Sequence, residues 1–233
     1  MRQPNNTSFQ LEKEREELKK IYPTLQIHKR PANFNLSKHV QLEKEAFIIE
    51  GTLPITLNGE ILISYEINIH IPEGFPQNRP TVYCKDKSLY NNARRKDRHI
   101  NDDHSACLCV HSDYKRFLGP DYTITEFITK LVLPYFKNQN YFEAHGKWPR
   151  NGRAHGKDGI VEFIAEHTGI RDENFAKKVL LLLSRRENIS PWIECPCGSK
   201  KIVKDCHGPK LWKLKHQVTP KDAQEDLLNF TAW

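Results

Sequence analysis

Hydrophobic and polar positions alternate strictly between Ile61 and Ile71, where isoleucines and Tyr65 occupy every second position. Successive side chains of a strand point to opposite faces, so this segment is predicted to be a strand with one buried face. Residues 46–55 predict a preceding strand, and the Asn58-Gly59 pair between them is the pattern most typical of a two-residue hairpin. A short strand over residues 79–84 completes an expected antiparallel meander.

Helical periodicity appears on both sides of these strands. Residues 8–21 predict a charged surface helix that ends before Pro23. A second helix begins at Thr123, because Thr123 and Glu126 have the spacing of a capping box and apolar residues then recur at helical intervals. We expect Pro134 to kink or end that helix.

The chain beyond this helix has a weaker pattern. Residues 137–157 have no apolar period and are predicted to be loop-like. Short helices are expected over residues 158–167 and 172–186, the second of them capped by Asp172.

The composition restricts the setting of the protein. The 233 residues contain no apolar run of membrane-spanning length, and the N-terminal segment lacks the apolar core of a signal peptide. We therefore expect a cytoplasmic protein with no membrane partner. The formal net charge is +7, and we interpret the excess as spread along the chain over a solvated surface. On that interpretation nucleic acid is not expected to be the main partner.

The six cysteines fall into two groups: Cys84, Cys107 and Cys109, and later Cys195, Cys197 and Cys206. In a cytosolic chain such grouping indicates catalysis or metal binding rather than a disulfide framework.

The first group lies beside groups that suit acyl-transfer chemistry. A nucleophilic cysteine needs partial exposure and a setting that favours the thiolate. The amide of Asn101 is a donor that can stabilise an oxyanion. The residues alone leave open the alternative of a packed, neutral thiol.

The order of motifs resembles ubiquitin-conjugating enzymes over residues 8–145. Residues 71–80 resemble the proline-rich turn of that family, and His99-Ile100-Asn101 resembles its His-Pro-Asn motif with the proline replaced. Cys109 follows His99 by ten residues, which is the spacing in the family, and residues 119–124 resemble the lead into its next helix. The resemblance implies an α+β, UBC-like fold: an N-terminal helix, a four-strand antiparallel meander, an active-site loop and C-terminal helices.

The resemblance also implies a chemistry. Cys109 would carry the C-terminus of a ubiquitin-like protein as a thioester and pass it to an amine of a target protein. Asn101 would stabilise the oxyanion or hold the loop, and His99 would fold the loop. The tryptophan often found after the cysteine is missing, and Asp121 and Glu143 are the candidates for the acidic residue that assists the amine.

Residues 148–160 resemble the segment after the core in bacterial conjugating enzymes of antiphage defence operons, which belong to cyclic-oligonucleotide signalling systems (CBASS). Members of that family attach the C-terminus of a nucleotidyltransferase (CD-NTase) to targets and so prime it. Whether an activating enzyme is also a partner stays open, because some such operons lack one. The alternative for this segment is an ordinary glycine-rich loop.

The second group places four potential metal ligands within thirteen residues: Cys195, Cys197, Cys206 and His207. Thiolate and imidazole donors favour zinc, and a closed four-ligand site is structural. The spacing resembles the SEC-C motif, a zinc knuckle. We expect a peptide this short to have no core of its own, so that Zn²⁺ supplies its folding energy.

These observations predict three parts: a UBC-like catalytic domain over residues 1–170, a helical connector over 171–190 and an SEC-C zinc-binding tail over 191–233. The expected function is an E2-like cysteine acyltransferase. Two alternatives remain: a non-catalytic module that binds a ubiquitin-like tail, and a zinc-dependent nucleic-acid-binding protein.

Overall fold

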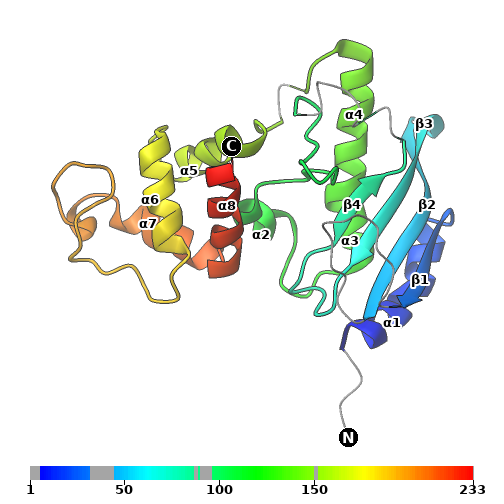
Figure 1. Ribbon diagram of the computed structural model, residues 1–233, viewed down its shortest axis with the longest axis horizontal. Coiled ribbons are helices and arrows are strands. Elements are labelled where there is room, and N and C mark those ends of the chain that lie inside the picture. Colours follow the sequence, from blue (N-terminus) through cyan, green and yellow to red (C-terminus); the bar gives the residue numbers. More distant parts are fainter. Residues whose placement is uncertain (1–5, 32–44, 87–88, 90–95, 150–151, 233) are drawn as a thin grey trace, which may run out of the picture. The chain divides into compact units, whose positions relative to one another are not determined.

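The computed structural model describes residues 6–31, 45–86, 89, 96–149 and 152–232 (Figure 1). The chain divides into two compact units. Residues 1–108 and 118–150 form the first, here called the sheet unit, and residues 109–117 and 151–233 form the second, the helical unit. The chain therefore leaves the sheet unit at Cys109, returns to it at Leu118 and leaves it again after residue 150.

The sheet unit contains a four-stranded antiparallel sheet in the order β1-β2-β3-β4, which confirms the predicted meander. Its strands are β1 (Leu25–Pro31), β2 (Glu45–Leu57), β3 (Glu60–Ile71) and β4 (Thr81–Cys84). The predicted hairpin joins β2 to β3. Asn58 and Gly59 both have positive φ, 51° and 87°, as a two-residue turn of this kind requires.

The burial of β3 changes along its length. Tyr65, Ile67, Ile69 and Ile71 are buried as the alternation predicts, whereas Ile61 is 66% exposed. The β2–β3 hairpin extends beyond both neighbouring strands, because β1 pairs with β2 only as far as Gly51 and β4 pairs with β3 only from Ile67 onward. The expected buried face therefore exists only in the second half of β3.

Helices cover the buried face of the sheet (Figure 1). They are α1 (Asn6–Ile21) and one helical run made of α3 (Ile124–Phe127), the π-helical turn η3 (Ile128–Val132) and α4 (Leu133–His145). The ring of Tyr65 in β3 lies 4.7 Å from that of Phe136 in α4. The end of α1 meets η3 where the Tyr22 and Thr129 hydroxyls hydrogen-bond at 2.8 Å.

The predicted capping box is present: the Thr123 hydroxyl accepts from the Glu126 amide, and the Glu126 carboxylate accepts from the Thr123 amide. The expectation that residues 137–157 form only a loop is wrong, because α4 continues to His145. Pro134 lies in the first turn of α4, directly after the π-helical turn, and the helical run does not end there. A π-helical turn alters the hydrogen-bond pairing, which accommodates a residue without an N–H.

The helical unit is built from α2 (Tyr114–Phe117), α5 (Gly156–Thr168), α6 (Glu173–Leu183), α7 (Gly208–Gln217) and α8 (Pro220–Ala232), with the 3₁₀ turns η2 (His111–Asp113) and η4 (Val203–Asp205). Helices α5 and α6 confirm the two predicted short helices, and the Asp172 carboxylate caps α6 by accepting from the Phe175 amide at 2.7 Å. Helices α7 and α8 were not predicted. Among the described residues, no helix has the length and apolarity to span a bilayer.

A buried carboxylate holds residues 109–117 in the helical unit. Asp226 of α8 is 1% exposed, and its two oxygens accept from the His111 and Ser112 amides at 2.9 and 2.6 Å. Arg153 donates to Asp113 at 2.8 Å and so ties the same segment to the residues before α5. Helix α8 therefore fixes the backbone at His111 and Ser112, two and three residues after Cys109.

Replacing Asp226 by alanine should destabilise the helical unit. Two buried amides lose a charged acceptor, so we expect the free energy of unfolding to fall by about 3 kcal/mol. The matched control is Asn229→Ala, an exposed change on the same helix, with an expected effect within about 0.5 kcal/mol. Urea denaturation followed by circular dichroism measures both, and equal midpoints for the two variants would contradict this role of Asp226.

Candidate functional site

The segment that carries the first cysteine group forms a short hairpin beside β4. Ile100 and Ala106 make an isolated antiparallel bridge, and the Asn101 amide donates to the Ser105 carbonyl at 2.9 Å. The Ala106 amide donates to the carbonyl of Val82 in β4 at 2.8 Å. The backbone thus places His99 and Asn101 on one arm of a fixed hairpin and Cys107 on the other.

Side chains of the hairpin hold its turn together. Asn101 Nδ2 donates to Ser105 Oγ at 2.9 Å, and Ser105 Oγ donates to Asp103 Oδ1 at 2.6 Å. Asp103 also accepts from the Ser105 amide. Of the two roles predicted for Asn101, this geometry matches the one in which the amide holds the loop. Ser105 was not among the predicted residues, since a lone serine four positions after Asn101 gives no distinctive sequence signal.

His99 has an aromatic environment. Its ring stacks on Trp148, with 4.3 Å between the ring centroids, and Trp148 also lies near Tyr135. His99 has a positive φ of 54°, and its carbonyl accepts from the Cys107 amide at 2.8 Å. The ring and the backbone of His99 therefore both take part in the packing of the hairpin.

Helix α4 anchors the start of the hairpin. The Arg98 carbonyl accepts from the Tyr135 hydroxyl at 3.3 Å and from the Gln139 amide group. The buried Arg98 guanidinium lies over the Phe142 ring, 4.8 Å from its centroid, and forms an ion pair with Glu143. Glu143, one of the two candidates for assisting an incoming amine, is thus engaged as the partner of Arg98.

The three cysteines of this group have different surroundings. Burial raises the pKa of Cys84 to about 11, so this thiol stays protonated at neutral pH. Cys107 and Cys109 are both half-buried. Cys107 belongs to the hairpin, whereas Cys109 opens the segment of residues 109–117 that the helical unit contains. The structure brings His99, Asn101 and Cys107 together in the sheet unit, and Cys109 is the first residue of the next segment of the helical unit.

The second cysteine group converges as predicted. The donor atoms of Cys195, Cys197, Cys206 and His207 all lie within 4.8 Å of one another, so the cluster can hold a metal ion. Neighbouring donors are separated by 3.4 Å (Cys195 Sγ to His207 Nδ1), 3.5 Å (Cys197 Sγ to Cys206 Sγ) and 3.1 Å (Cys206 Sγ to His207 Nδ1). A tetrahedral zinc site with roughly 2.3 Å zinc–sulfur bonds has edges of about 3.8 Å, so the donors are spaced on this scale.

The local backbone explains why the four donors meet. Glu194 and Ile202 form an antiparallel bridge, and the Cys195 amide donates to the Lys201 carbonyl at 2.8 Å. Gly198 turns this loop with a φ of +80°, a conformation that favours glycine. Cys206 and His207 directly precede α7, so their positions depend on that helix.

Ser199 joins this cluster without having been predicted. Its Oγ lies 3.2 Å from Cys197 Sγ and 3.3 Å from Cys206 Sγ. Hydrogen bonding with Ser199 lowers the pKa of Cys197, whereas burial raises the pKa of Cys195. A bound cation would favour the thiolate at all three cysteines.

The expectation that the knuckle has no core is wrong. Cys195 is 2% exposed and Val203 is fully buried, and both belong to the apolar core shared by α5, α6, α7 and α8. The helical unit thus includes residues from all three predicted parts of the chain. The boundaries at 170/171 and 190/191 stay predictions. Because the knuckle packs on an apolar core, its folding does not depend on the metal alone.

Comparisons with known proteins find a distant likeness to two solved structures. A complex of the Vps23 UEV with ubiquitin is 13% identical and aligns with a TM-score of 0.38, covering 54% of this chain and 79% of that chain. The yeast Vps23 UEV domain in complex with a Vps27 PSDP peptide is 13% identical, with a TM-score of 0.41, and the match covers 64% of this chain and 86% of that chain. No family model and no curated protein matches.

The ligand set predicts one bound zinc ion per chain, measured by elemental analysis of the purified protein. Cys206→Ser should lose most of it and lower the melting temperature of the helical unit, because metal binding contributes to folding. Cys84→Ser is the matched control and should keep the ion, since Cys84 lies in β4. Unchanged zinc content in Cys206→Ser would contradict the assignment.

Proposed function

We propose that the protein is a ubiquitin-conjugating-enzyme-like transferase whose Cys109 carries a protein C-terminus as a thioester. One observation carries the proposal: the order of elements. A helix and a four-strand antiparallel meander precede the fixed hairpin with His99 and Asn101, and Cys109 and the capping-box helix at Thr123 follow it. This is the order that the sequence resemblance implies.

The reaction has two balanced steps. The Cys109 thiolate attacks the activated carbonyl of a protein C-terminus, a carbon–sulfur bond forms, and the activating group leaves with its electron pair. An unprotonated amine of the target then attacks the thioester, a carbon–nitrogen bond forms, and the carbon–sulfur bond breaks. The thiolate leaves with the electron pair of that bond, and the nitrogen loses one proton to water or to the departing sulfur. The hairpin that carries His99 and Asn101 is held by a backbone hydrogen bond to β4, and the Arg98 carbonyl at its start is held by α4.

The resemblance of residues 148–160 suggests the donor. We propose that it is the C-terminus of a CD-NTase or of another protein with a ubiquitin-like tail, and that an activating enzyme supplies the energy where the operon encodes one. In this proposal the ligands Cys195, Cys197, Cys206 and His207 bind zinc with a structural role, which would fix the start of α7.

A serine trap tests the covalent step. Cys109→Ser, expressed in the native host, should gain a protein-sized mass that survives thiols, because a serine ester resists the thiol exchange that cleaves a thioester. Cys107→Ser is the matched control and should show no thiol-stable adduct, since its Cys109 thioester remains cleavable. If Cys109→Ser gains no adduct, and if wild type without reductant gains none, the non-catalytic binding module becomes the better account.

A second pair of variants distinguishes the two roles predicted for Asn101. If its amide holds the turn, Asn101→Ala and Ser105→Ala both remove the same hydrogen bond and should slow thioester formation by a similar factor, about two- to tenfold. Single-turnover assays measure the two rates. If Asn101→Ala formed the thioester much more slowly than Ser105→Ala, the result would show instead that the Asn101 amide acts on the reacting carbonyl.

A further inference from the structure

One stretch of the helical unit carries a net charge as large as that of the whole chain. Residues 177–215 hold ten of the 36 Lys and Arg residues but only three of the 29 Asp and Glu residues, a net charge of +7. This equals the formal net charge of the whole chain, so the remaining residues balance to zero. This stretch covers most of α6, the knuckle and most of α7, so the helical unit has a basic segment besides the short cluster at residues 94–96.

The basic residues of the helical unit differ in how they are paired. Arg153, Lys157 and Arg171 each form an ion pair with a carboxylate. Within the described part of the chain, the exposed basic residues of the stretch 177–215 form no ion pair with an acidic side chain. They are Lys177, Lys178, Arg185, Arg186, Lys200, Lys201, Lys204, Lys210 and Lys213. Unpaired surface cations of this number favour a polyanionic partner.

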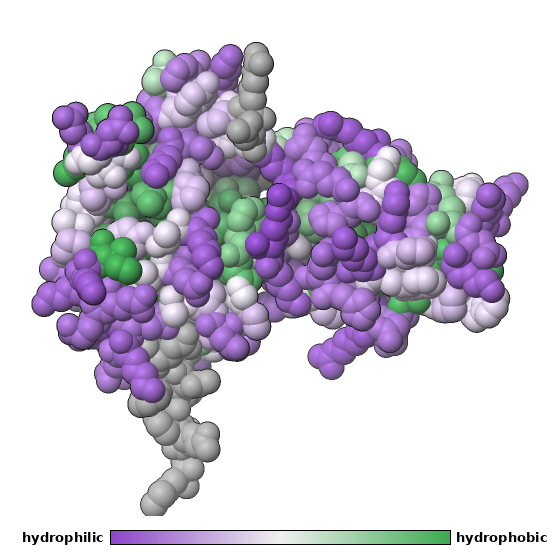
Figure 2. Space-filling view, turned by 180° about the vertical axis from the view of Figure 1, so that it is seen from behind, coloured by the Kyte–Doolittle hydropathy of each residue, from purple (hydrophilic) through white to green (hydrophobic). Residues whose placement is uncertain are grey.

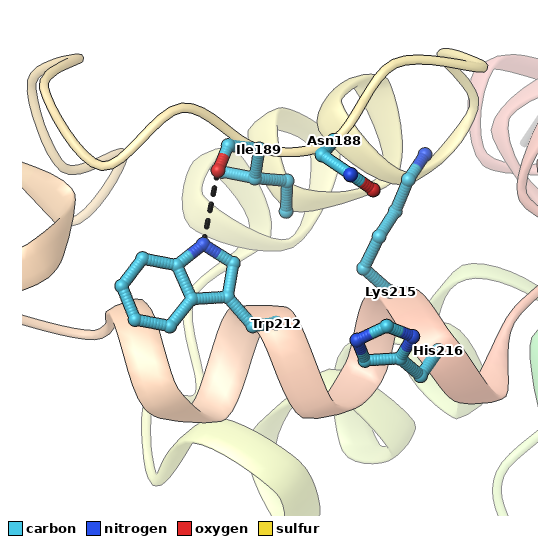
Figure 3. A pocket seen from close by; sticks show the side chains of 5 residues that line it. All are labelled: Asn188, Ile189, Trp212, Lys215 and His216. Carbon is cyan, nitrogen blue, oxygen red and sulfur yellow. Dashed lines mark hydrogen bonds between the residues drawn. The ribbon is translucent and has the colours of Figure 1, made fainter.

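A furrow runs through this basic region. One depression of about 260 Å³ is lined by Asn188, Ile189, Trp212, Lys215 and His216 (Figure 3). A second depression of about 220 Å³ shares Asn188 and Ile189 and continues past Arg185 to Ile193. The two hollows therefore share one short segment. Lys215 lines the first, and Arg185 lines the second together with the acidic Glu187.

The furrow is held open by bonds between its walls. The Trp212 indole nitrogen donates to the Ile189 carbonyl at 3.0 Å, which fixes the segment over α7 (Figure 3). Lys215 of α7 donates to the carbonyls of Leu183 and Arg185 at the end of α6. These contacts bind the walls without covering the hollow.

An exposed aromatic ring belongs to the same segment of the chain. Trp192 lies in sequence between Ser190 and Ile193, which both line the second depression, and is 67% exposed. The ammonium group of Lys204 lies 4.3 Å from the Trp192 ring centroid, and the Lys204 amide donates to the Pro191 carbonyl. A large aromatic ring beside a cation is thus presented to solvent. The face of the helical unit that Figure 2 shows is mostly hydrophilic.

We propose that a single-stranded nucleic acid binds this furrow, which Arg185 and Lys215 line, together with the exposed pair of Trp192 and Lys204. Cations along a groove neutralise successive phosphates, and an exposed aromatic ring stacks on an unpaired base. A duplex would hide the base faces that Trp192 can stack on. An acidic peptide would match the charge but would leave the ring without a flat partner.

The test uses the zinc-loaded full chain and a fluorescein-labelled thymidine oligonucleotide of about 15 nucleotides, with binding followed by anisotropy across a salt series. Arg185→Gln/Lys204→Gln should weaken binding about tenfold and reduce the salt slope by about 1.4, the value for two phosphates on a single strand. Lys157→Gln/Arg171→Gln removes the same charge from ion-paired positions and should change the affinity less than about twofold. Trp192→Ala should weaken binding about fivefold or more with an unchanged salt slope.

Three results would overturn the proposal. The first is no measurable binding at about 0.1 M salt, and the second is an equal loss in the two double variants, which would indicate only general attraction. The third is displacement of the oligonucleotide by polyglutamate of equal charge at a lower concentration than by unlabelled oligonucleotide, which would identify an acidic protein partner instead.

Discussion

The position of Cys109 depends on a carboxylate more than a hundred residues away. Asp226 accepts from the His111 and Ser112 amides, and this contact keeps residues 109–117 in the helical unit. A carboxylate with 1% exposure is stable only when its oxygens accept hydrogen bonds. The burial of Asp226 therefore favours the backbone conformation that places the His111 and Ser112 amides against it. In sequence, the candidate nucleophile opens the short segment of the helical unit that separates the two segments of the sheet unit.

The two units are stabilised differently. The sheet unit relies on aliphatic burial between β2, β3 and the helices, with polar contacts such as that of Gln139 with the Arg98 carbonyl holding the hairpin to α4. The helical unit has its own apolar core, into which Cys195 and Val203 of the knuckle are packed. A metal at the knuckle would hold the start of α7, and α7 and α8 are consecutive in the chain. The candidate metal site and the segment after Cys109 thus belong to the same folded unit.

The sequence predicts those features whose cause is local. The Asn58-Gly59 turn, the capping box at Thr123 and the Asp172 cap each depend on residues within a few positions, and all three are present. The convergence of the four metal ligands was also predictable, because the spacing is short. The periodic residues Leu211 and Leu214 of α7, with Val218 directly after the helix, carried a helical signal that the lysines between them obscured. Two features were not predicted: the continuation of α4 past Pro134 and the contact of Asp226 with the His111 and Ser112 amides. Both depend on tertiary packing, which a local sequence pattern does not indicate.

The claim that Cys109 is the acyl carrier is tested most directly on the wild-type protein. The protein is recovered from its native host in acid without reductant, and its electrophoretic mobility is compared before and after dithiothreitol. The account predicts a protein-sized adduct that disappears with the thiol and that Cys109→Ala never forms. An adduct that persists in Cys109→Ala, or a wild-type protein that carries none, would contradict it.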